Sequence, residues 1–261
     1  MPIYFDWRWQ GQGNWRRTGV RMAAKIGIVG GVGWPGTIAY YESLCRQARP
    51  LGSLGSPHIS IESLDMACTI AARGHPGDER SWRTFDRIFV DALNRLAQAG
   101  CDLAAIASVT PHSRIASIAA ESPIPLVNIV DAVARQLAIE MPETVLVLGT
   151  GVTMRSTIFD TVIQATGCTR IATTEQQLTE FSNLLEKYFY QNRGAEGRTE
   201  LLRFVRSLTS ECGPTLTILA CTDLTPAFPE IGETALFAAG GIRFLDATHA
   251  HVGAILDAAN A

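Results

Sequence analysis

The chain has 261 residues, of which 47% are hydrophobic and 18% are charged, and its formal net charge at pH 7 is −3. This length provides enough core for one large domain or two smaller ones. The slight negative charge argues against a nucleic acid or an anionic membrane as the main partner, and no apolar run is long enough to span a bilayer.

Residues 1–21 differ in composition from the rest of the chain. They contain three tryptophans and four arginines, and no apolar stretch follows the basic residues. We therefore expect a disordered, dispensable extension rather than a secretory signal. The six cysteines show neither the spacing of a zinc site nor that of a disulfide framework, which is typical of free thiols in a reducing cytoplasm.

The first predicted strand, Ile26–Val29, is followed by a glycine-rich turn at residues 30–36. The turn contains the pattern G-x-G-x-x-G, which is common in dinucleotide-binding folds. However, Pro35 interrupts the pattern, and no acidic residue ends a second strand about 20 residues further on. We therefore expect the turn to present backbone N–H groups to a small anion at the start of a helix over Thr37–Gln47.

Further along the first half, apolar and polar residues alternate over His58–Leu64, as in a strand. Trp82–Ala99 has the periodicity of a helix, and a third strand is expected at Leu103–Ala107. The polar segment Arg73–Arg80 between them is a candidate lid. Its first residue, Arg73, could bind a carboxylate, although a loop arginine more often faces solvent.

The second half continues the alternation of strands and helices, which predicts parallel sheets with helices on both faces. We expect strands at Pro123–Asn128 and Val145–Leu148, a last strand that ends at Asp246, and helices at Ile129–Ile139, Phe181–Tyr190, Thr199–Thr209 and Ala250–Ala259.

Within this second half, the apolar run Leu216–Ala220 ends in Cys221, Thr222 and Asp223. Such a run predicts a buried parallel strand, and ligands bind at the carboxyl ends of strands in open α/β sheets. A thiol beside a hydroxyl and a carboxylate at that position is a candidate for chemistry. Free cysteines are equally often small core residues, so the strand alone leaves both interpretations open.

Two segments of the first half resemble segments of the second. Asp102–His112 repeats the pattern around Cys221, with Ser108 in the place of the cysteine. Lys25–Gly31 resembles Thr144–Thr150 at almost the same spacing. Two similar halves, each directing one strand end, predict a pseudo-twofold α/β protein in which Ser108 and Cys221 face each other across a cleft.

Four motifs, taken in this order, are similar to those of a known family. GIVGGVGWPGT at 27–37, ASVTPH at 107–112, LACTDL at 219–224 and DATHAH at 246–251 resemble four segments of the cofactor-independent aspartate/glutamate racemases. Those segments are the glycine-rich opening, the CNT-x-H and GCTE-L motifs and the closing D-T-x-x-H. The opening is most similar to the GGMSWEST form of the subgroup specific for L-aspartate and L-glutamate, with Trp34 in register.

The resemblance implies two pseudo-symmetric domains, each a mainly parallel four-stranded sheet flanked by helices, with the active site in the cleft between them. One domain would comprise residues 22–122 plus 240–261, and the other residues 123–239. The resemblance also implies a cytoplasmic homodimer that acts on an acidic amino acid or dicarboxylate and uses no pyridoxal phosphate, no other cofactor and no metal.

In that family a thiolate removes the α-proton from one enantiomer, and an opposite thiol returns a proton to the other face of the carbanion. Carried over, Cys221 is one base and serves the L-enantiomer, while Ser108, assisted by His112, stands where the other thiol is usual. The substrate-binding residues that the resemblance implies are Gly31, Val32, Gly33, Val109, Thr110, Thr150, Arg155, Thr222, Asp223 and His251.

The chain departs from the family at the first motif, where Ser108 and Val109 replace the usual Cys and Asn. A serine hydroxyl is a far weaker acid than a thiol, so it abstracts an α-proton poorly. The sequence is therefore compatible with a racemase with unequal bases, with a single-cysteine lyase or isomerase (decarboxylase or maleate-isomerase-like), and with a silent dicarboxylate binder. A nucleotide-binding oxidoreductase is the least favoured alternative.

Overall fold

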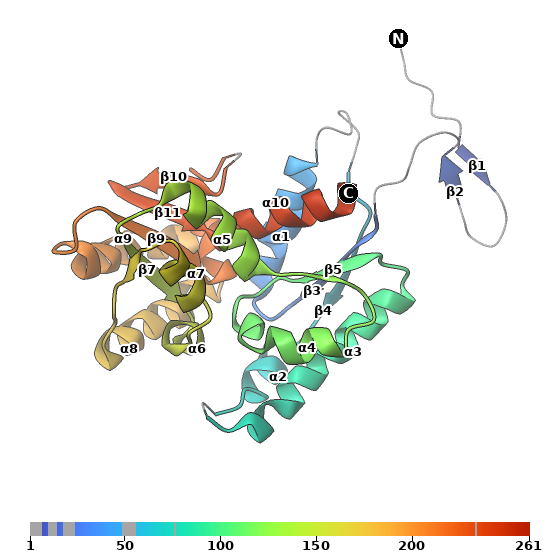
Figure 1. The fold of residues 1–261 in the computed structure, drawn as a ribbon, viewed down its shortest axis with the longest axis horizontal. Coiled ribbons are helices and arrows are strands. Elements are labelled where there is room, and N and C mark those ends of the chain that lie inside the picture. Colours follow the sequence, from blue (N-terminus) through green and yellow to red (C-terminus); the bar gives the residue numbers. More distant parts are fainter. Residues whose placement is uncertain (1–6, 10–14, 18–23, 49–55, 76, 233) are drawn as a thin grey trace, which may run out of the picture.

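The computed structural model describes residues 7–9, 15–17, 24–48, 56–75, 77–232 and 234–261. Two α/β halves lie side by side, with α1 (Trp34–Gln47) and α10 (Ala247–Asn260) between them (Figure 1). Most of the expected extension lies outside the described residues. Within it, β1 (Trp7–Trp9) and β2 (Trp15–Arg17) form an antiparallel pair, so these residues are strands rather than a disordered segment.

The first half is built on a parallel sheet with the strand order β4-β3-β5-β6. Successive residues of a strand point to opposite faces, and the apolar strands β3 and β5 are buried on both. α3 (Arg83–Gln98) and α4 (Ile115–Ala120) cover one face, while α1 and α10 cover the other. The strands are β3 (Ile26–Gly30), β4 (Ile59–Ser63), β5 (Leu103–Ile106) and β6 (Leu126–Val127).

The second half has the strand order β10-β11-β9-β7-β8. Four of its strands are parallel, and the edge strand β10 is antiparallel. α8 (Glu175–Leu184) and α9 (Gly194–Thr209) cover one face, and α5 (Ile129–Glu140) and α7 (Asp160–Ala165) cover the other. The strands are β7 (Thr144–Gly149), β8 (Thr169–Arg170), β9 (Thr215–Ala220), β10 (Leu236–Ala239) and β11 (Ile242–Asp246).

The two-domain α/β fold is therefore confirmed, but the second sheet has five strands rather than the expected four, and neither β8 nor β10 was among the predicted strands. Gly240 and Gly241, with φ angles of 56° and 78°, connect β10 to β11, and Ala239 pairs with Ile242. Positive φ at both central residues is the geometry of a tight hairpin turn, which glycine adopts without steric cost. This glycine pair was the signal for β10.

The strand pairing also divides the chain differently from the expected domain boundaries. β6 falls in the expected domain 123–239 but pairs with β5, and β11 falls in the expected segment 240–261 but pairs with β9. The chain therefore passes between the halves after β6 and again after β11. Backbone hydrogen bonds decide which sheet a strand joins, and a short apolar run has the same pattern in either sheet.

Short helices follow several strands at the side where the halves meet. η3 follows β5, α6 follows β7 and η5 follows β9, so each strand end is continued by a compact turn. The short helices are α2 (Met66–Ala71), η2 (Glu79–Trp82), η3 (Thr110–Arg114), α6 (Gly151–Arg155), the π-helix η4 (Leu185–Phe189) and η5 (Thr222–Ala227).

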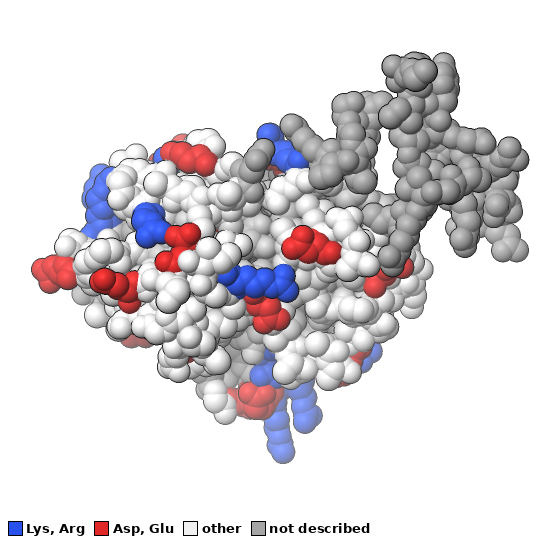
Figure 2. Space-filling model, turned by 45° about the horizontal axis from the view of Figure 1, so that its top comes forward, with Lys and Arg blue, Asp and Glu red and all other residues white. Residues whose placement is uncertain are grey.

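Acidic and basic side chains are interspersed on the molecular face shown in Figure 2. Many charged side chains are paired; Arg114, for example, forms ion pairs with both Glu79 and Asp86. None of the helices that the structure describes has the length and hydropathy needed to cross a membrane.

Candidate active site

The strand ends of the two halves meet at one small cavity. β5 leads into Ser108 and β9 leads into Cys221, and both residues line the cavity. Its volume is about 10 Å³, which is room for about one water molecule, so the lining residues must move before an amino acid can enter. The lining residues are Val32, Gly33, Met66, Arg73, Ser108, Val109, Thr110, Thr150, Tyr190, Ala220, Cys221, Thr222 and Asp223.

Cys221 is the residue immediately before η5, and its side chain is buried. Its thiol donates a long hydrogen bond of 3.9 Å to Asp223 Oδ2. Burial raises the pKa of the Cys221 thiol, and the negative charge of Asp223 raises it further, while the backbone N–H of Asp223 and the charge of Arg73 lower it. The sulfur is therefore a protonated thiol at neutral pH.

Asp223 belongs to the second half but is held by the first. Its Oδ1 accepts a hydrogen bond of 2.9 Å from the backbone N–H of Gly36. Burial raises the pKa of Asp223 to about 6, so the carboxyl group is ionised above that pH. The glycine-rich turn was expected to bind a small anion, and in this closed structure the anion that it binds is the Asp223 carboxylate.

Two glycines of that turn make room for the opposite strand end. A Cβ atom on Gly33 would lie 2.2 Å from Asp223 Oδ2, and one on Gly36 would lie 2.4 Å from Thr222 Oγ1. These distances are far shorter than a van der Waals contact, so any larger residue would displace the pair that follows Cys221. The spacing of Gly33 and Gly36 is therefore explained by contact between the halves rather than by a dinucleotide.

The Ser108 strand end has a different environment, made of hydroxyl groups. Thr110 Oγ1 lies 2.9 Å from Thr150 Oγ1 across the boundary between the halves, and Thr150 Oγ1 lies 3.2 Å from Thr153 Oγ1. None of these side chains carries a charge. The cluster therefore offers neutral donors and acceptors beside Ser108.

His112 was expected to assist the Ser108 hydroxyl, but its observed hydrogen bond goes to the backbone. His112 Nδ1 donates to the Ser108 carbonyl oxygen at 2.8 Å. Burial lowers the pKa of His112 to about 4, so the ring is neutral, and its Nε2 is buried with no hydrogen-bond partner among the described residues. The ring does not line the cavity, and it holds the turn that carries Ser108.

His251 has a structural environment as well. Its Nδ1 accepts a hydrogen bond of 2.8 Å from the Tyr40 hydroxyl, and its Nε2 donates to the Val127 carbonyl at 2.9 Å. Burial lowers the pKa of His251 to about 3. The ring packs edge-on against His112, with 5.6 Å between ring centroids, and it does not line the cavity. Both histidines therefore lie outside the lining of the cavity.

Two further predicted binding residues lie outside the cavity. Arg155 is half exposed and forms a two-point ion pair with Glu175, at 3.0 and 2.6 Å. Gly31 turns the chain after β3 with a φ of 79°, and its N–H donates to Thr37 Oγ1. Three lining residues were not among the predicted site residues: Met66, Arg73 and Tyr190.

Of these three, Arg73 had a signal in the sequence, because it begins the glycine-rich polar loop considered as a lid. Tyr190 follows the π-helix η4, and Met66 begins α2. Both side chains resemble ordinary amphipathic-helix residues, so no sequence pattern separates them from the core.

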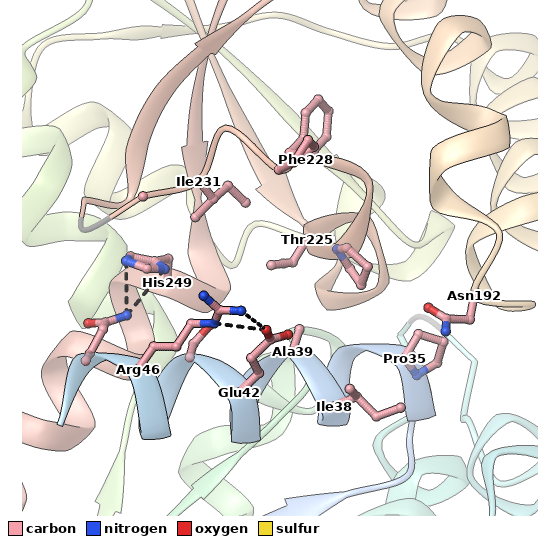
Figure 3. Close-up of a pocket in the computed structure, with 15 residues that line it drawn as sticks. Pro35, Ile38, Ala39, Glu42, Arg46, Asn192, Thr225, Phe228, Ile231 and His249 are labelled. Carbon is pink, nitrogen blue, oxygen red and sulfur yellow. Dashed lines mark hydrogen bonds and ion pairs between the residues drawn. The ribbon is translucent and has the colours of Figure 1, made fainter. Parts of the chain in front are cut away.

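A larger hollow of about 1050 Å³ lies elsewhere, between α1 and the segment 225–232. In Figure 3, Phe228 and Ile231 lie on one side of it, and the Glu42–Arg46 ion pair of α1 lies on the other. Neither Cys221 nor Ser108 lines this hollow. Size alone therefore does not identify the site where the reactive groups of the chain converge.

Comparisons with known proteins agree with this geometry. A family model described as Asp/Glu/Hydantoin racemase matches residues 29–255. An aspartate racemase homologue from Pyrococcus horikoshii OT3 is 22% identical, with a TM-score of 0.71 over 91% of this chain and 100% of that one. An aspartate racemase from Picrophilus torridus is 18% identical, with a TM-score of 0.71 over 90% and 94%.

A glutamate racemase from Campylobacter jejuni subsp. jejuni is 17% identical, with a TM-score of 0.58 over 88% of this chain and 83% of that one. At these identities the solved structures show a shared fold. The family model, in contrast, matches nearly the whole sequence. The chain therefore belongs to the Asp/Glu/Hydantoin racemase family.

Proposed function

We propose that the protein racemises an acidic amino acid, aspartate or glutamate, without a cofactor, by moving the α-proton between Cys221 and Ser108. One observation carries this proposal: the strand ends of the two halves deliver a thiol and a hydroxyl to the same closed cavity. A racemase needs one group on each face of a planar carbanion, because the proton leaves from one face and returns to the other.

The thiol must lose its proton before it can act as a base, and the substrate itself supports this step. Asp223 raises the pKa of Cys221 through its negative charge. The α-ammonium group of a bound amino acid carries the opposite charge and would pair with Asp223. This pairing cancels the effect of the carboxylate on the sulfur, so binding of the substrate favours the thiolate.

The Ser108 side works differently. Its hydroxyl donates a proton to the more basic carbanion, and the resulting alkoxide regains a proton from solvent or from the Cys221 thiol before the next turnover. Abstraction of the α-proton from the D-enantiomer requires the alkoxide to form first, which is less favourable. Net racemisation must still reach equal amounts of both enantiomers, so kcat/KM is the same in both directions. The asymmetry appears instead in isotope exchange: L-substrate should exchange its α-proton with solvent faster than it inverts. Exchange without inversion is the signature of one strong and one weak base.

The test is NMR of the α-proton of L-Asp, D-Asp, L-Glu and D-Glu in D₂O, without pyridoxal phosphate. We expect loss of the α-proton signal from the L-enantiomer and slower appearance of the D-enantiomer. If none of the four amino acids loses its α-proton, the proposal is wrong. Exchange that never leads to inversion would show that Ser108 is not a competent partner.

A second candidate function is a single-thiol lyase or isomerase, because Cys221 is the one cysteine among the cavity-lining residues and Ser108 and Val109 replace the usual pair. Such an enzyme would decarboxylate a disubstituted malonate or isomerise maleate. Turnover of these compounds, with no exchange from any amino acid, would favour this function. Binding of dicarboxylates with neither activity would indicate a silent binder.

The family resemblance also implies a homodimer, and α1 offers a surface for one. Trp34, Ile38 and Tyr41 are 45%, 52% and 51% exposed, and their spacing places them along one side of the helix. We expect two copies to bury this stripe against each other. Light scattering should show a dimer for the wild-type protein and a monomer for Ile38→Asp.

A further inference from the structure

Three of the residues that line the cavity have long side chains: Met66, Arg73 and Tyr190. The other lining residues are glycine, alanine, serine, cysteine, threonine, valine and aspartate, whose side chains are short. Tyr190 is the bulkiest of all of them. Because the cavity has room for about one water molecule, any lining side chain that keeps its place limits the length of the ligand that fits.

The backbone that carries Tyr190 is held on both sides. Tyr190 follows the π-helix η4, and its N–H donates to the Leu185 carbonyl at 2.9 Å, which is the i→i−5 bond of a π-turn. After it, the Arg193 N–H donates to the Tyr188 carbonyl at 2.8 Å. Single π-turns within helices are rare and occur frequently at functional sites.

Three consecutive aromatic residues around this turn have different environments. The Tyr188 hydroxyl donates to Glu200 Oε1 at 2.6 Å, and Phe189 is fully buried. Tyr190, in contrast, is half-buried and lines the cavity. The turn therefore anchors two aromatic side chains in the second half and leaves the third at the site.

Tyr190 also has a fixed relation to the reactive sulfur. It packs against the hydrophobic cluster of the second half that contains both Phe189 and Cys221. Burial raises the pKa of the Tyr190 phenol, and Cys221 raises it further, while the charge of Arg73 lowers it. The phenol therefore lies near the thiol, and any movement of the first half leaves the ring in place relative to Cys221.

The proposed function determines how an amino acid would lie in the site. Its α-carbon lies between Cys221 and Ser108, and its ammonium group pairs with Asp223. The Thr110 and Thr150 hydroxyls beside Ser108 suit the α-carboxylate, because they are neutral donors. The side chain of the substrate is left to extend among the remaining lining residues, of which Tyr190 is the bulkiest.

We propose that the Tyr190 ring limits the length of the substrate side chain and thereby selects the four-carbon aspartate over the five-carbon glutamate. This proposal rests on the proposed function, because it decides which acidic amino acid the same site accepts. A side chain that is longer by one methylene has to displace a ring whose backbone is held by the core. One methylene typically changes kcat/KM by about 10–200-fold, so we expect a preference of about 10²-fold for L-aspartate.

The test is a series of variants in which residue 190 becomes smaller. Tyr190→Phe keeps the ring and should keep the preference for aspartate over glutamate within about threefold. Tyr190→Leu should reduce this preference, and Tyr190→Ala should reduce it by about tenfold or more, because glutamate gains room. NMR in D₂O gives kcat/KM for both amino acids. Tyr188→Phe, which removes a hydroxyl outside the cavity, is the matched control and should keep the preference.

Binding of two dicarboxylates separates this proposal from the proposed function. Succinate should raise the melting temperature of the wild type and of Tyr190→Phe more than glutarate does at the same concentration. For Tyr190→Ala the two compounds should give equal shifts. Circular dichroism checks the fold of each variant, and if Tyr190→Ala does not fold, the same comparison is made with Tyr190→Leu.

The outcomes distinguish the two proposals. If no amino acid is racemised but the discrimination between succinate and glutarate depends on Tyr190, the proposed function fails and the role of Tyr190 stands. The role of Tyr190 is wrong if the wild type prefers glutamate, or if the leucine and alanine variants keep the wild-type preference. It is also wrong if Tyr190→Phe loses the preference as fully as Tyr190→Ala, because the hydroxyl rather than the ring would then be responsible. If neither amino acid is racemised and neither dicarboxylate binds, both proposals are wrong.

Discussion

The two strand ends that line the cavity occupy equivalent positions in the two halves but differ in charge. The end of β9 presents Cys221 beside the carboxylate of Asp223. The end of β5 presents Ser108 beside threonine hydroxyls and above a neutral histidine. Equivalent backbone positions therefore carry two different groups. One is the ionisable Cys221 thiol, whose pKa is shifted by nearby charges, and the other is the neutral Ser108 hydroxyl. The fold places the two strand ends in equivalent positions, and the side chains make them chemically different.

The contacts between the halves retain the twofold pattern despite this difference. The residues after Cys221 contact the glycine turn after β3, through the hydrogen bond from Gly36 to Asp223. The residues after Ser108 contact the turn after β7, through Thr110 and Thr150. Each reactive strand end is thus packed on the first turn of the opposite half. Any separation of the halves would break both contacts and would release both strand ends.

The largest effect should come from removing the charged side of this comparison. Cys221→Ala should reduce α-proton exchange from L-aspartate by about 10³-fold or more, because the variant lacks the thiol that we propose removes the α-proton. Cys212→Ala, which changes a half-buried cysteine away from the cavity, is the control and should match the wild type. NMR in D₂O measures both variants. Full exchange by Cys221→Ala would exclude the thiol as the base.

The second-largest loss of α-proton exchange should follow from disturbing the contact that holds Asp223. Gly33→Ala places a Cβ atom 2.2 Å from Asp223 Oδ2, so the carboxylate must move, and we expect a loss of about 10²-fold in exchange. Gly253→Ala in α10 meets no atom within 4 Å and should leave activity unchanged. An active Gly33→Ala variant with wild-type rates would show that the position of Asp223 is not critical.

Restoring the symmetry of the two bases should have a moderate effect in the opposite direction. Ser108→Cys replaces a weak acid by a thiol, and we expect racemisation to increase about tenfold. The ratio of exchange to inversion for L-aspartate should then approach that of an enzyme with two equal bases. Polarimetry and NMR on the same sample measure inversion and exchange. A decrease in both rates would indicate that Ser108 acts through packing rather than proton transfer.

The smallest effect concerns stability and its dependence on pH. Burial raises the pKa of Asp223 from 3.8 to about 6, so the cost of ionising this carboxyl group in the folded state is small at pH 4, grows between about pH 4 and pH 6, and is complete above about pH 6. Asp223→Asn should therefore increase the free energy of unfolding by about 1–3 kcal/mol at pH 8 and have little effect at pH 4. Urea denaturation at the two pH values tests this. An equal change at both would assign the effect to packing.

Much of the fold could be predicted from local patterns. The apolar runs that became β3, β5, β7 and β9 are followed by turn and helix signals, so parallel strands with crossover helices were the direct interpretation. The antiparallel edge strand β10 was missed because its main signal, Gly240-Gly241, is a turn rather than an apolar run. The short strand β6 was assigned to the other half because its two residues do not indicate a pairing partner.

The candidate site was predictable only where a residue is attached directly to a strand end. Ser108, Thr110, Thr150 and Cys221 follow β5, β7 or β9, and the structure brings them together. Arg155 has a suitable charge and position in the sequence, but Glu175 pairs with it on the surface. His112 lies close to Ser108 in the sequence, but its ring bonds to the backbone.

By itself, the sequence determined the alternation of strands and helices, the internal repeat and the two strand ends that carry a thiol and a hydroxyl. These features depend on neighbouring residues, whose spacing is visible in the chain. Only the tertiary structure decided which charged groups share the cavity. Arg73, Asp223 and the Gly36 N–H come from separate segments of the chain. Burial raises the pKa of Asp223, and the buried Arg73 Nε has no hydrogen-bond partner in the part of the chain that the structure describes. Such electrostatic effects depend on distance in space and on exclusion of water, neither of which a linear pattern records.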